Sequence, residues 1–467
     1  MENDSKSIIQ TFKRNMTKLE EFCNEHEILY IYGAGKYGAK YYNLIKDKHK
    51  VSGFIVSAEK DCGSYQGLPV FCVDILPACS GRAGIIPAFK GSSAGKIKEN
   101  FPAESVDVFD IEAHDFLIYS SIIKPFLDIH ERLKEYGFPA KLPLPPRDAR
   151  VNILITRLDA IGDVICTTPL IREVRRNYPN AFITVVIRKQ NKELLENCPY
   201  IVELLLYDAG YDEQSFFEKD FEYNSLQQKV KSFVTAFYKR KFDIAFQGTE
   251  ILGGRNACQE LLLVLESGAR WRIGHVGFNS EIIANIFSDV YSQISLHLFA
   301  MHETVYMLEM LRKCGLKIER YQPELFPAEK NREKAALLLN NHCFTRKTYF
   351  IAVGLTGSLP HKNWPEENYC NLFNKIYAEF DDSIIFVLLG NKDVHDEAER
   401  LEQQCKNVLN CTGICSLNDT VAVIGKCDLY LGSNTGLLHM AAAARVNAIV
   451  LYGECLSDTP YIGGGSV

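Results

Sequence analysis

Residues 152–169 read N-I-L-I-T-R-L-D-A-I-G-D-V-I-C-T-T-P. The apolar run at 153–155 predicts a buried strand, a tight turn ends at Gly162, and from Asp163 onward the apolar residues recur with a helical period. A strand that passes to a helix through Gly places backbone N–H groups and one polar side chain at the carboxyl edge of a sheet. Open α/β sheets bind ligands at that edge. Asp163 is therefore either a helix N-cap or a catalytic carboxylate facing a cleft.

The same alternation of strand and helix continues along the chain. Strands are predicted at 152–156, 182–187, 201–206, 242–247 and 271–275, and a second series at 349–353, 384–389, 408–411, 428–431 and 448–452. A βαβ series folds into a mostly parallel sheet with helices on both faces. The pattern therefore predicts an α/β protein with two Rossmann-like lobes in tandem and a ligand cleft between their carboxyl edges.

A proline-rich segment precedes these lobes. Pro139, Pro143, Pro145 and Pro146 fall within residues 138–150. Prolines at this density make a stiff, extended linker. We therefore expect a separate small Rossmann-like domain over residues 1–137.

That small domain contains the sequence G-A-G-K-Y-G between a predicted strand and a predicted helix. Gly33, Gly35 and Gly38 match the G-x-G-x-x-G turn that binds dinucleotides. The turn usually has an acidic residue at the end of the second strand, where this chain has Ser57. Two interpretations stay open: a dinucleotide cofactor bound at this turn, or a tight β–α turn without a ligand.

The bulk composition is that of an ordinary globular protein. The chain has 467 residues, of which 47% are hydrophobic and 24% charged, with a formal net charge of −6. Its length predicts more than one domain, and its charge gives no basic footprint for nucleic acid. The 15 cysteines are scattered, which favours free thiols in a reducing compartment. Because no signal peptide or membrane-spanning apolar run is present, a cytoplasmic location is predicted.

Three motifs occur in a specific order. They are R-L-D-A-I-G-D-V-I-C-T-T-P at Arg157–Pro169, K-N-W-P at Lys362–Pro365, and D-L-Y-L-G-S-N-T-G-L-L-H-M-A-A-A at Asp428–Ala443. With these motifs, residues 151–467 resemble glycosyltransferase family 9, the heptosyltransferases. The resemblance implies the GT-B fold, with an acceptor lobe at 151–326 and a nucleotide-sugar donor lobe at 327–467. Residues 1–150 lie outside it and resemble small nucleotide-binding-like domains attached to sugar-modifying enzymes.

The resemblance also implies roles for individual residues. Sugar transfer requires a base for the acceptor hydroxyl and groups that hold the departing diphosphate. Asp163 matches the family's catalytic base. A helix that opens at Thr435-Gly436 would offer its N–H groups and positive dipole end to the diphosphate, and the Lys362 ammonium would take the place of a metal ion. The expected donor-binding residues are Lys362, Thr356, Asn434, Thr435, Gly436 and His439, and for His439 a core or capping role is the alternative.

Two departures from the family pattern concern the donor lobe. Asn434 stands where the family usually has Asp, which bears on the donor sugar because an amide carries no charge. Family members also continue into a final helix, whereas this sequence stops at Val467, shortly after the last predicted strand. The donor lobe is therefore expected to be short at its C-terminus.

The leading hypothesis is a metal-independent, inverting glycosyltransferase without a required cofactor. It would move a sugar, heptose from ADP-heptose by the resemblance, to a lipopolysaccharide-core or other surface-glycan acceptor. Its partners would be the nucleotide-sugar and a glycan or glycolipid, with a peripheral contact at the inner face of the membrane left open. One alternative is an NAD(P)-dependent nucleotide-sugar oxidoreductase or epimerase step in the N-terminal domain. The other is a non-catalytic nucleotide-sugar binding protein.

Overall fold

The computed structural model describes residues 14–57, 62–73, 83–88, 106–109, 136, 139–140, 143–208, 223–239, 241–251, 256–276, 291–296, 302–340, 348–355, 363–380 and 383–451. The chain divides into two compact units. The first comprises Met1–Gly137 with Glu213–Tyr223, and the second comprises Phe138–Asp212 with Asn224–Val467. The second unit contains both of the sheets that the sequence predicts after the proline-rich segment.

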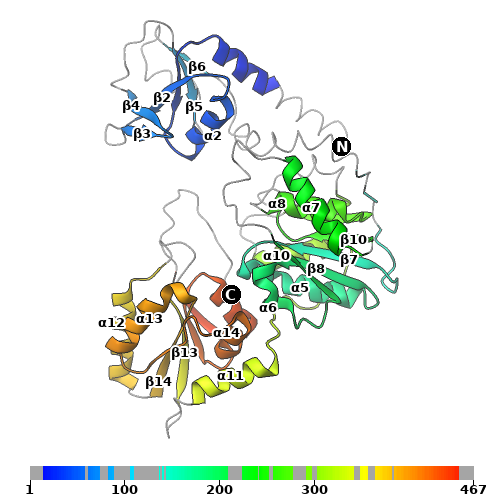
Figure 1. The fold of residues 1–467 in the computed structure, drawn as a ribbon, viewed down its shortest axis with the longest axis vertical. Helices are drawn as coiled ribbons and strands as arrows, with labels where there is room; N and C mark the ends of the chain where they lie inside the picture. Colours follow the sequence, from blue (N-terminus) through cyan, green and yellow to red (C-terminus); the bar gives the residue numbers. More distant parts are fainter. Residues whose placement is uncertain are drawn as a thin grey trace. The chain divides into compact units, whose positions relative to one another are not determined.

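The first unit is a small sheet with an adjoining helix, α2 (Lys36–Ile45) (Figure 1). Its strands lie in the order β3 (Gly63–Tyr65), β4 (Leu68–Cys72), β2 (Val51–Val56), β1 (Leu29–Tyr32), β5 (Ala83–Pro87), β6 (Val106–Val108). All neighbours are parallel except β3 and β4. Because β1 lies between β2 and β5, the strand order reverses beside it, and α2 begins at this reversal. The order is that of a Rossmann-like domain, as predicted.

The first lobe of the second unit contains a six-stranded parallel sheet. Its strand order is β12 (Gln293–Leu296), β11 (Trp271–Val276), β10 (Ile244–Gln247), β7 (Asn152–Arg157), β8 (Phe182–Arg188), β9 (Glu203–Tyr207). Its helices are α5 (Ile161–Asn177), η4 (Lys189–Asn191), α6 (Lys192–Leu195), α7 (Tyr223–Phe237), α8 (Ala257–Glu266) and α10 (Glu303–Lys313).

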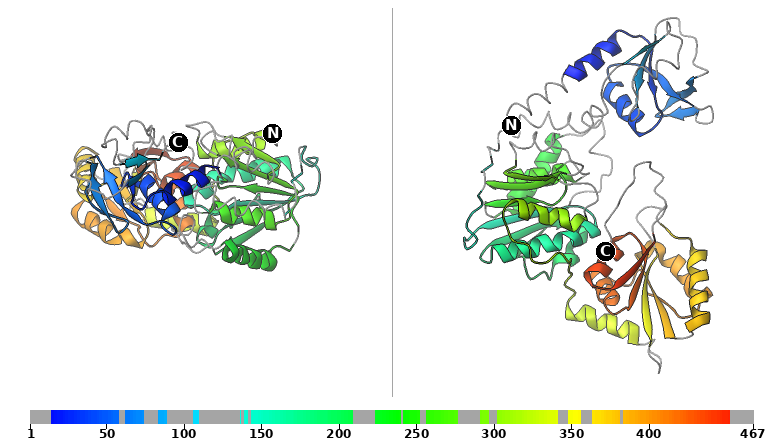
Figure 2. Two further views of the ribbon diagram at one scale, coloured as in Figure 1. Left: turned by 90° about the horizontal axis from the view of Figure 1, so that it is seen from above. Right: turned by 180° about the vertical axis from the view of Figure 1, so that it is seen from behind.

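The second lobe repeats this architecture with five parallel strands. Their order is β15 (Val408–Asn410), β14 (Ile384–Leu389), β13 (Tyr349–Gly354), β16 (Leu429–Ser433), β17 (Asn447–Leu451). Its helices are α11 (Glu329–Asn340), α12 (Glu366–Phe380), η8 (Lys392–Val394), α13 (His395–Gln404), α14 (Leu417–Ile424) and α15 (Gly436–Ala443). In Figures 1 and 2, α12 and α13 cover one face of this sheet, and α11 and α14 lie on the other.

Every strand predicted in residues 151–467 is present, within two residues at either end. The central strands are apolar and buried because helices cover both faces of each sheet. Within these residues, two described elements were not predicted, β12 and α11. The apolar stripe of α11 is narrow, since its buried residues are only Asn331, Ala335 and Leu339 at a spacing of four.

The segment that connects the lobes is fastened along α5 by side chains. Arg172 has a side chain 1% exposed, and it donates hydrogen bonds to the carbonyls of Arg320 and Gln322 at 2.6 and 2.9 Å. Asn177 bonds both the N–H and the carbonyl of Lys317, and Thr168 accepts from the N–H of Glu324 at 3.0 Å. These contacts fix the connecting segment to the helix that begins beside Asp163.

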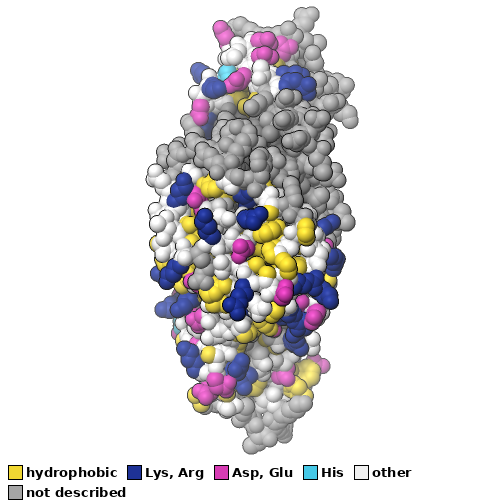
Figure 3. Space-filling model, turned by 90° about the vertical axis from the view of Figure 1, so that its right-hand side faces the viewer, with side chains coloured by type: hydrophobic (Ala, Val, Ile, Leu, Met, Phe, Trp, Pro, Cys, Tyr) yellow, Lys and Arg dark blue, Asp and Glu magenta, His cyan; other side chains and the backbone are white. Residues whose placement is uncertain are grey.

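A continuous apolar core joins the two lobes, running from β7 and α5 to α14 and α15. None of the described helices combines the length and the apolar character needed to cross a membrane. On the face shown in Figure 3, basic and acidic side chains are interspersed over the described residues.

Candidate active site

Asp163 lies in the first turn of α5, but it is not the helix N-cap. The helix begins at Ile161, two residues earlier than predicted, and its N-cap is Ala160. Asp163 is the third residue of the helix, and its Oδ2 accepts a hydrogen bond from the Ala160 N–H at 3.0 Å. The proposal of an N-cap was therefore wrong in detail, because the tight turn predicted at residues 160–162 is already the start of the helix. The Asp163 side chain is 38% exposed.

A buried arginine lies next to this carboxylate. Arg157 ends β7, and its side chain is 4% exposed. Its guanidinium meets three carboxylates: Asp159 Oδ2 at 3.1 Å from Nε, and Asp163 Oδ1 and Glu303 Oε1 at 3.3 and 2.9 Å from Nη2. Glu303 is the first residue of α10, so the site combines the carboxyl edge of the sheet with two helix N-termini.

A buried polar network supports the loop between β7 and α5. Glu260 of α8 is fully buried and accepts hydrogen bonds from the Leu158 N–H, the Thr156 hydroxyl and the Thr249 N–H. The Thr249 hydroxyl lies 2.5 Å from Glu260 and 2.6 Å from Asp159, although it has one proton for the two carboxylates. Burial raises the pKa of Glu260, with Asp159 adding to the rise and Arg157 and the Thr249 hydrogen bonds opposing it.

The two lobes meet where α5 and α15 begin. A Cβ at Gly162 would lie 2.6 Å from His439 Cδ2, and a Cβ at Gly436 would lie 2.9 Å from Ile161 Cγ2. The Cys166 Sγ is 3.6 Å from His439 Nδ1. Each helix start thus uses a glycine to let the other approach, and this contact brings the first turn of α5, which contains Asp163, against the first turn of α15, which contains His439.

The helix α15 lacks a side-chain cap. Thr435 occupies the N-cap position, but its hydroxyl bonds no N–H of the helix and is buried without a hydrogen-bond partner in the described part of the chain. The buried Tyr430 hydroxyl lies next to it and likewise has no well-formed hydrogen bond there. No acidic residue stands in the first turn of α15. The positive end of this helix is therefore available to an anionic ligand.

Burial dominates the titration of the groups around Asp163. It raises the pKa of Asp163, with Asp159 and Glu303 adding to the rise and Arg157 opposing it. Burial lowers the pKa of His439 and of His302, the N-cap of α10, so both imidazoles are neutral near pH 7. Burial also raises the pKa of the Cys166 thiol to about 12. The site therefore holds a carboxylate of increased basicity among neutral imidazoles.

The structure describes four of the six predicted donor-binding residues. Lys362 and Thr356 lie outside the described residues. Asn434, Thr435 and Gly436 stand in sequence at the start of α15, and Asn434 is half-buried. His439 packs against Gly162 and Cys166 of the other lobe.

Sequence reasoning missed Glu303 and His302 and gave Arg157 no role. Arg157 could have been found, because it stands in the quoted motif six residues before Asp163. The two α10 residues gave no signal, since they come from a distant part of the chain.

In the first unit the three glycines differ in their surroundings. Gly33 has a φ of +121°, which favours glycine, and a Cβ at Gly38 would lie 1.9 Å from the Gly33 carbonyl oxygen. No heavy atom of the described residues lies within 4 Å of a Cβ built at Gly35, the N-cap of α2. These are the surroundings that a dinucleotide-binding turn requires: a turn, an open approach and close packing. Ser57 is hydrogen-bonded to the Tyr32 hydroxyl at 2.8 Å.

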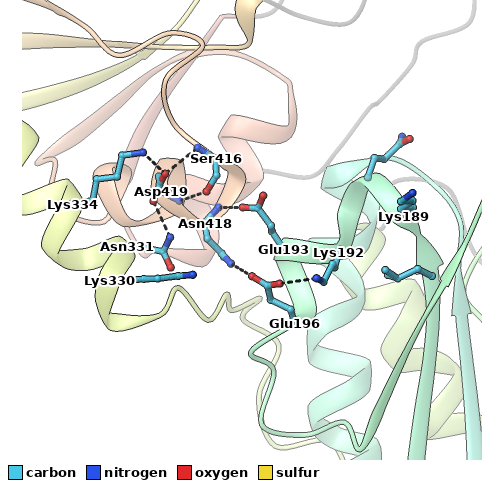
Figure 4. Close-up of a pocket in the computed structure, with 12 residues that line it drawn as sticks. Lys189, Lys192, Glu193, Glu196, Lys330, Asn331, Lys334, Ser416, Asn418 and Asp419 are labelled. Atoms are coloured by element: carbon cyan, nitrogen blue, oxygen red, sulfur yellow. Dashed lines mark hydrogen bonds and ion pairs between the residues drawn. The ribbon is translucent and has the colours of Figure 1, made fainter.

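A cavity of about 790 Å³ lies between the lobes, on the side of α6 and α14 (Figure 4). Asn418, in the first turn of α14, bridges it by donating its backbone N–H to Glu193 at 3.1 Å and its side-chain amide to Glu196 at 3.2 Å. Figure 4 shows these two bonds crossing from one lobe to the other. The Glu193 carboxylate thus caps a helix of the opposite lobe, which helps to hold the lobes together.

Comparisons with known proteins agree with this architecture. Residues 261–459 match the model of glycosyltransferase family 9 (heptosyltransferase). The chain is 22% identical over 328 residues to lipopolysaccharide heptosyltransferase 2 of Escherichia coli, an alignment that covers 66% of this chain and 84% of that protein. It is 23% identical over 317 residues to the lipopolysaccharide core heptosyltransferase OpsX of Haemophilus influenzae, covering 67% and 83%.

Among solved structures, the chain is similar to the glycosyl transferase family 9 protein of Veillonella parvula. The TM-score is 0.54 at 20% identity, covering 67% of this chain and 82% of that one. The predicted GT-B arrangement of two Rossmann-like lobes is confirmed. Nothing in these comparisons supports the oxidoreductase or epimerase alternative.

Proposed function

Because the chain carries a glycosyltransferase family 9 domain and is a glycosyltransferase, we propose that it transfers heptose from ADP-heptose to a sugar of a lipopolysaccharide core. The heptose and the lipopolysaccharide core come from the names of the relatives. The ADP group comes from the resemblance of the three sequence motifs. The division of the second unit into an acceptor lobe and a donor lobe is part of the same proposal.

The observation that carries the proposal is the contact between α5 and α15. Gly162 and Gly436 let the two helix starts touch, so that the first turn of α5, with Asp163, meets the uncapped first turn of α15. A carboxylate and an anion-binding helix start are the two elements that transfer from a nucleotide diphosphate requires. Neither lobe supplies both.

In the proposed reaction Asp163 takes the proton of the acceptor hydroxyl. The acceptor oxygen forms a bond to the anomeric carbon of heptose from the side opposite the diphosphate. The bond from that carbon to the phosphate oxygen breaks, and its electron pair leaves with ADP. The N–H groups at Gly436, the Thr435 hydroxyl and the Lys362 ammonium would stabilise the charge that grows on the diphosphate. Because the new bond forms on the opposite face, the configuration at the anomeric carbon is inverted.

The membrane contact is part of the proposal as well. A lipopolysaccharide-core acceptor is a glycolipid, so transfer to it requires the protein to reach a membrane surface. We therefore expect a cytoplasmic protein that associates peripherally with the inner face of the membrane. Co-sedimentation with vesicles that contain the acceptor glycolipid, compared with vesicles that lack it, measures this association.

The test of the catalytic role is ADP release from ADP-heptose with a lipid-core acceptor. Asp163→Asn keeps the size of the side chain and removes the base, so the rate is expected to fall about 10²–10⁴-fold. Asp148→Asn, an exposed site in the linker, is the matched control and leaves the rate unchanged. Equal rates for wild type and Asp163→Asn would refute the role of Asp163. Binding of ADP-heptose without turnover over a panel of acceptors would favour a non-catalytic binding protein.

For the first unit we propose a nucleotide site at the start of α2. The open surroundings of Gly35, together with the packing of Gly38 against the turn, support it. NADH and NADPH are titrated against the full chain and against Gly35→Val, whose Cβ would lie more than 4 Å from the described residues around this turn and would occupy the approach to it. Binding by wild type that the variant loses is expected. The absence of binding at millimolar dinucleotide would leave only the tight-turn interpretation.

A further inference from the structure

Two carboxylates, Asp163 and Glu303, contact the same nitrogen of Arg157 at different distances. Arg157 Nη2 is 2.9 Å from Glu303 Oε1 and 3.3 Å from Asp163 Oδ1. Charge-assisted N–H···O bonds are typically about 2.7–2.9 Å long. Glu303 therefore makes the well-formed bond to this nitrogen, and Asp163 makes a looser contact.

The arginine itself is fixed. Its Nη1 donates to the Gly248 carbonyl and lies 3.6 Å from Met307 Sδ, and its Nε faces Asp159. Gly248 has no room for a side chain, because a Cβ there would lie 2.4 Å from the Thr156 carbonyl oxygen and 2.9 Å from Arg157 Cδ. A guanidinium held at Nη1 by the Gly248 carbonyl and at Nη2 by Glu303 has little freedom to turn toward Asp163. The strength of the contact between Arg157 and Asp163 therefore depends on the carboxylates that compete for Arg157.

We propose that Arg157 and Glu303 are positioning residues for Asp163: Arg157 orients the Oδ1 atom, and Glu303 competes for the same nitrogen, so that Oδ1 remains able to accept a proton. The proposal rests on the role of Asp163 as the base in the proposed function. A carboxylate fully paired with an arginine is a weak base, since the cation stabilises its charged form. Glu303 limits that pairing and thus keeps the base reactive.

The remaining groups that face Asp163 fit this assignment. From its own segment these are Asp159 and Cys166, and from α15 it is His439, which in turn interacts with His302. The thiol and the two imidazoles are uncharged near pH 7 because burial favours their neutral forms. The charged neighbours of Asp163 are then Arg157, Asp159 and Glu303, of which Asp159 already accepts hydrogen bonds from Thr249 and Asn256.

The first test follows the titration of Asp163 directly. The full chain is labelled with ¹³C at aspartate carboxyls, and the Asp163 signal is the one lost in Asp163→Asn. Glu303→Gln removes the competing charge from a side chain that is 32% exposed, so the protein should fold. Its Asp163 pKa is expected to fall, because Asp163 is then the only carboxylate that pairs with Arg157 Nη2. Arg157→Lys loses the planar guanidinium that contacts several carboxylates at once, and is expected to raise the Asp163 pKa.

The second test uses ADP release as a function of pH. The base must be deprotonated, so the acidic limb of kcat/KM follows the Asp163 pKa. Glu303→Gln moves this limb to lower pH, and Arg157→Lys moves it to higher pH. Shifts of opposite sign separate positioning from simple damage to the fold, which would lower activity at every pH. Glu309→Gln, on the same helix and paired with Arg312, is the matched control and leaves the limb in place.

The outcomes separate the two proposals. An Asp163 signal that Glu303→Gln leaves unmoved, or moves to higher pH, overturns the positioning role, even if Asp163→Asn is inactive. Full activity of Asp163→Asn overturns the proposed function, and the carboxyl titration still decides whether Glu303 and Arg157 control Asp163. If Arg157→Lys does not fold, Glu303→Gln decides alone.

Discussion

The contact between Gly162 and His439 makes a quantitative prediction about the junction of the lobes. A Cβ at Gly162 would lie 2.6 Å from His439 Cδ2 and 2.9 Å from Nε2. Carbon atoms pack at about 3.5–4.0 Å, so the ring must move by roughly 1 Å. Overpacking of this kind costs about 1–3 kcal/mol. Gly162→Ala is therefore expected to destabilise the second unit, even though alanine favours a helix by up to about 1 kcal/mol over glycine.

A second substitution reverses the sign. His439→Ala removes the ring that the new methyl group would strike. In that background Gly162→Ala should be neutral, or stabilise by up to about 1 kcal/mol through helix propensity alone. The double-mutant cycle then gives a coupling free energy of about 1–3 kcal/mol between a residue of α5 and a residue of α15.

Urea unfolding of the full chain, followed by tryptophan fluorescence, measures this coupling. The chain has two tryptophans, Trp271 and Trp364, which lie in the first and second lobes of the second unit, so the signal does not report on the first unit. Equal destabilisation by Gly162→Ala with and without the His439 ring would refute the described packing. No destabilisation in the wild-type background would mean that the lobes separate at no cost, which would remove the basis for a shared active site.

Three other predictions concern separate parts of the molecule. Thr435→Val should change the free energy of unfolding by less than about 0.5 kcal/mol, because the Thr435 hydroxyl makes no cap hydrogen bond whose loss would cost about 1 kcal/mol. The KM for ADP-heptose should nevertheless rise. A loss of stability with an unchanged KM would make Thr435 an ordinary helix cap. Arg172→Ala should destabilise the second unit by about 3–5 kcal/mol, since it strands buried partners, whereas the exposed Arg312→Ala should cost under about 1 kcal/mol in the same urea titration. Gly38→Ala should abolish the cooperative unfolding transition of the first unit, because the new methyl group would lie 1.9 Å from a backbone carbonyl oxygen. Gly35→Ala, whose methyl group meets no described atom, should keep that transition. Far-UV circular dichroism measures both.

The fold could be predicted from sequence because its signals are local. Most strands of the two lobes are short apolar runs followed by a helix, so the periodicity indicates parallel sheets. The elements that were missed lack this signal. The helix α11, E-K-N-R-E-K-A-A-L-L-L-N, buries only three residues and is polar over most of its surface. Its position depends on packing against α14, which the local sequence does not encode.

The site was only partly predictable, because its chemistry depends on contacts between distant residues. The motif around Asp163 could be recognised within a single stretch. Glu303, however, is 146 residues from Arg157 along the chain, and nothing in the local sequence distinguishes it from other surface glutamates. The same limit applies to Gly162 and Gly436. The sequence around each is that of a routine turn or helix glycine. Only the packing of Gly162 against His439 and of Gly436 against Ile161 shows why neither position has room for a side chain.

The choice between a helix role and a site role for Asp163 was posed too narrowly. A carboxylate has two oxygens, and the structure gives them different partners. Oδ2 bonds the Ala160 N–H of its own helix, and Oδ1 faces Arg157 and the charges around it. The bond at Oδ2 restricts rotation of the side chain, and this restriction holds Oδ1 in place. A base that is held by its own helix loses little entropy when it engages an acceptor. The structural role of Asp163 in the first turn of α5 thus favours the catalytic role proposed for it.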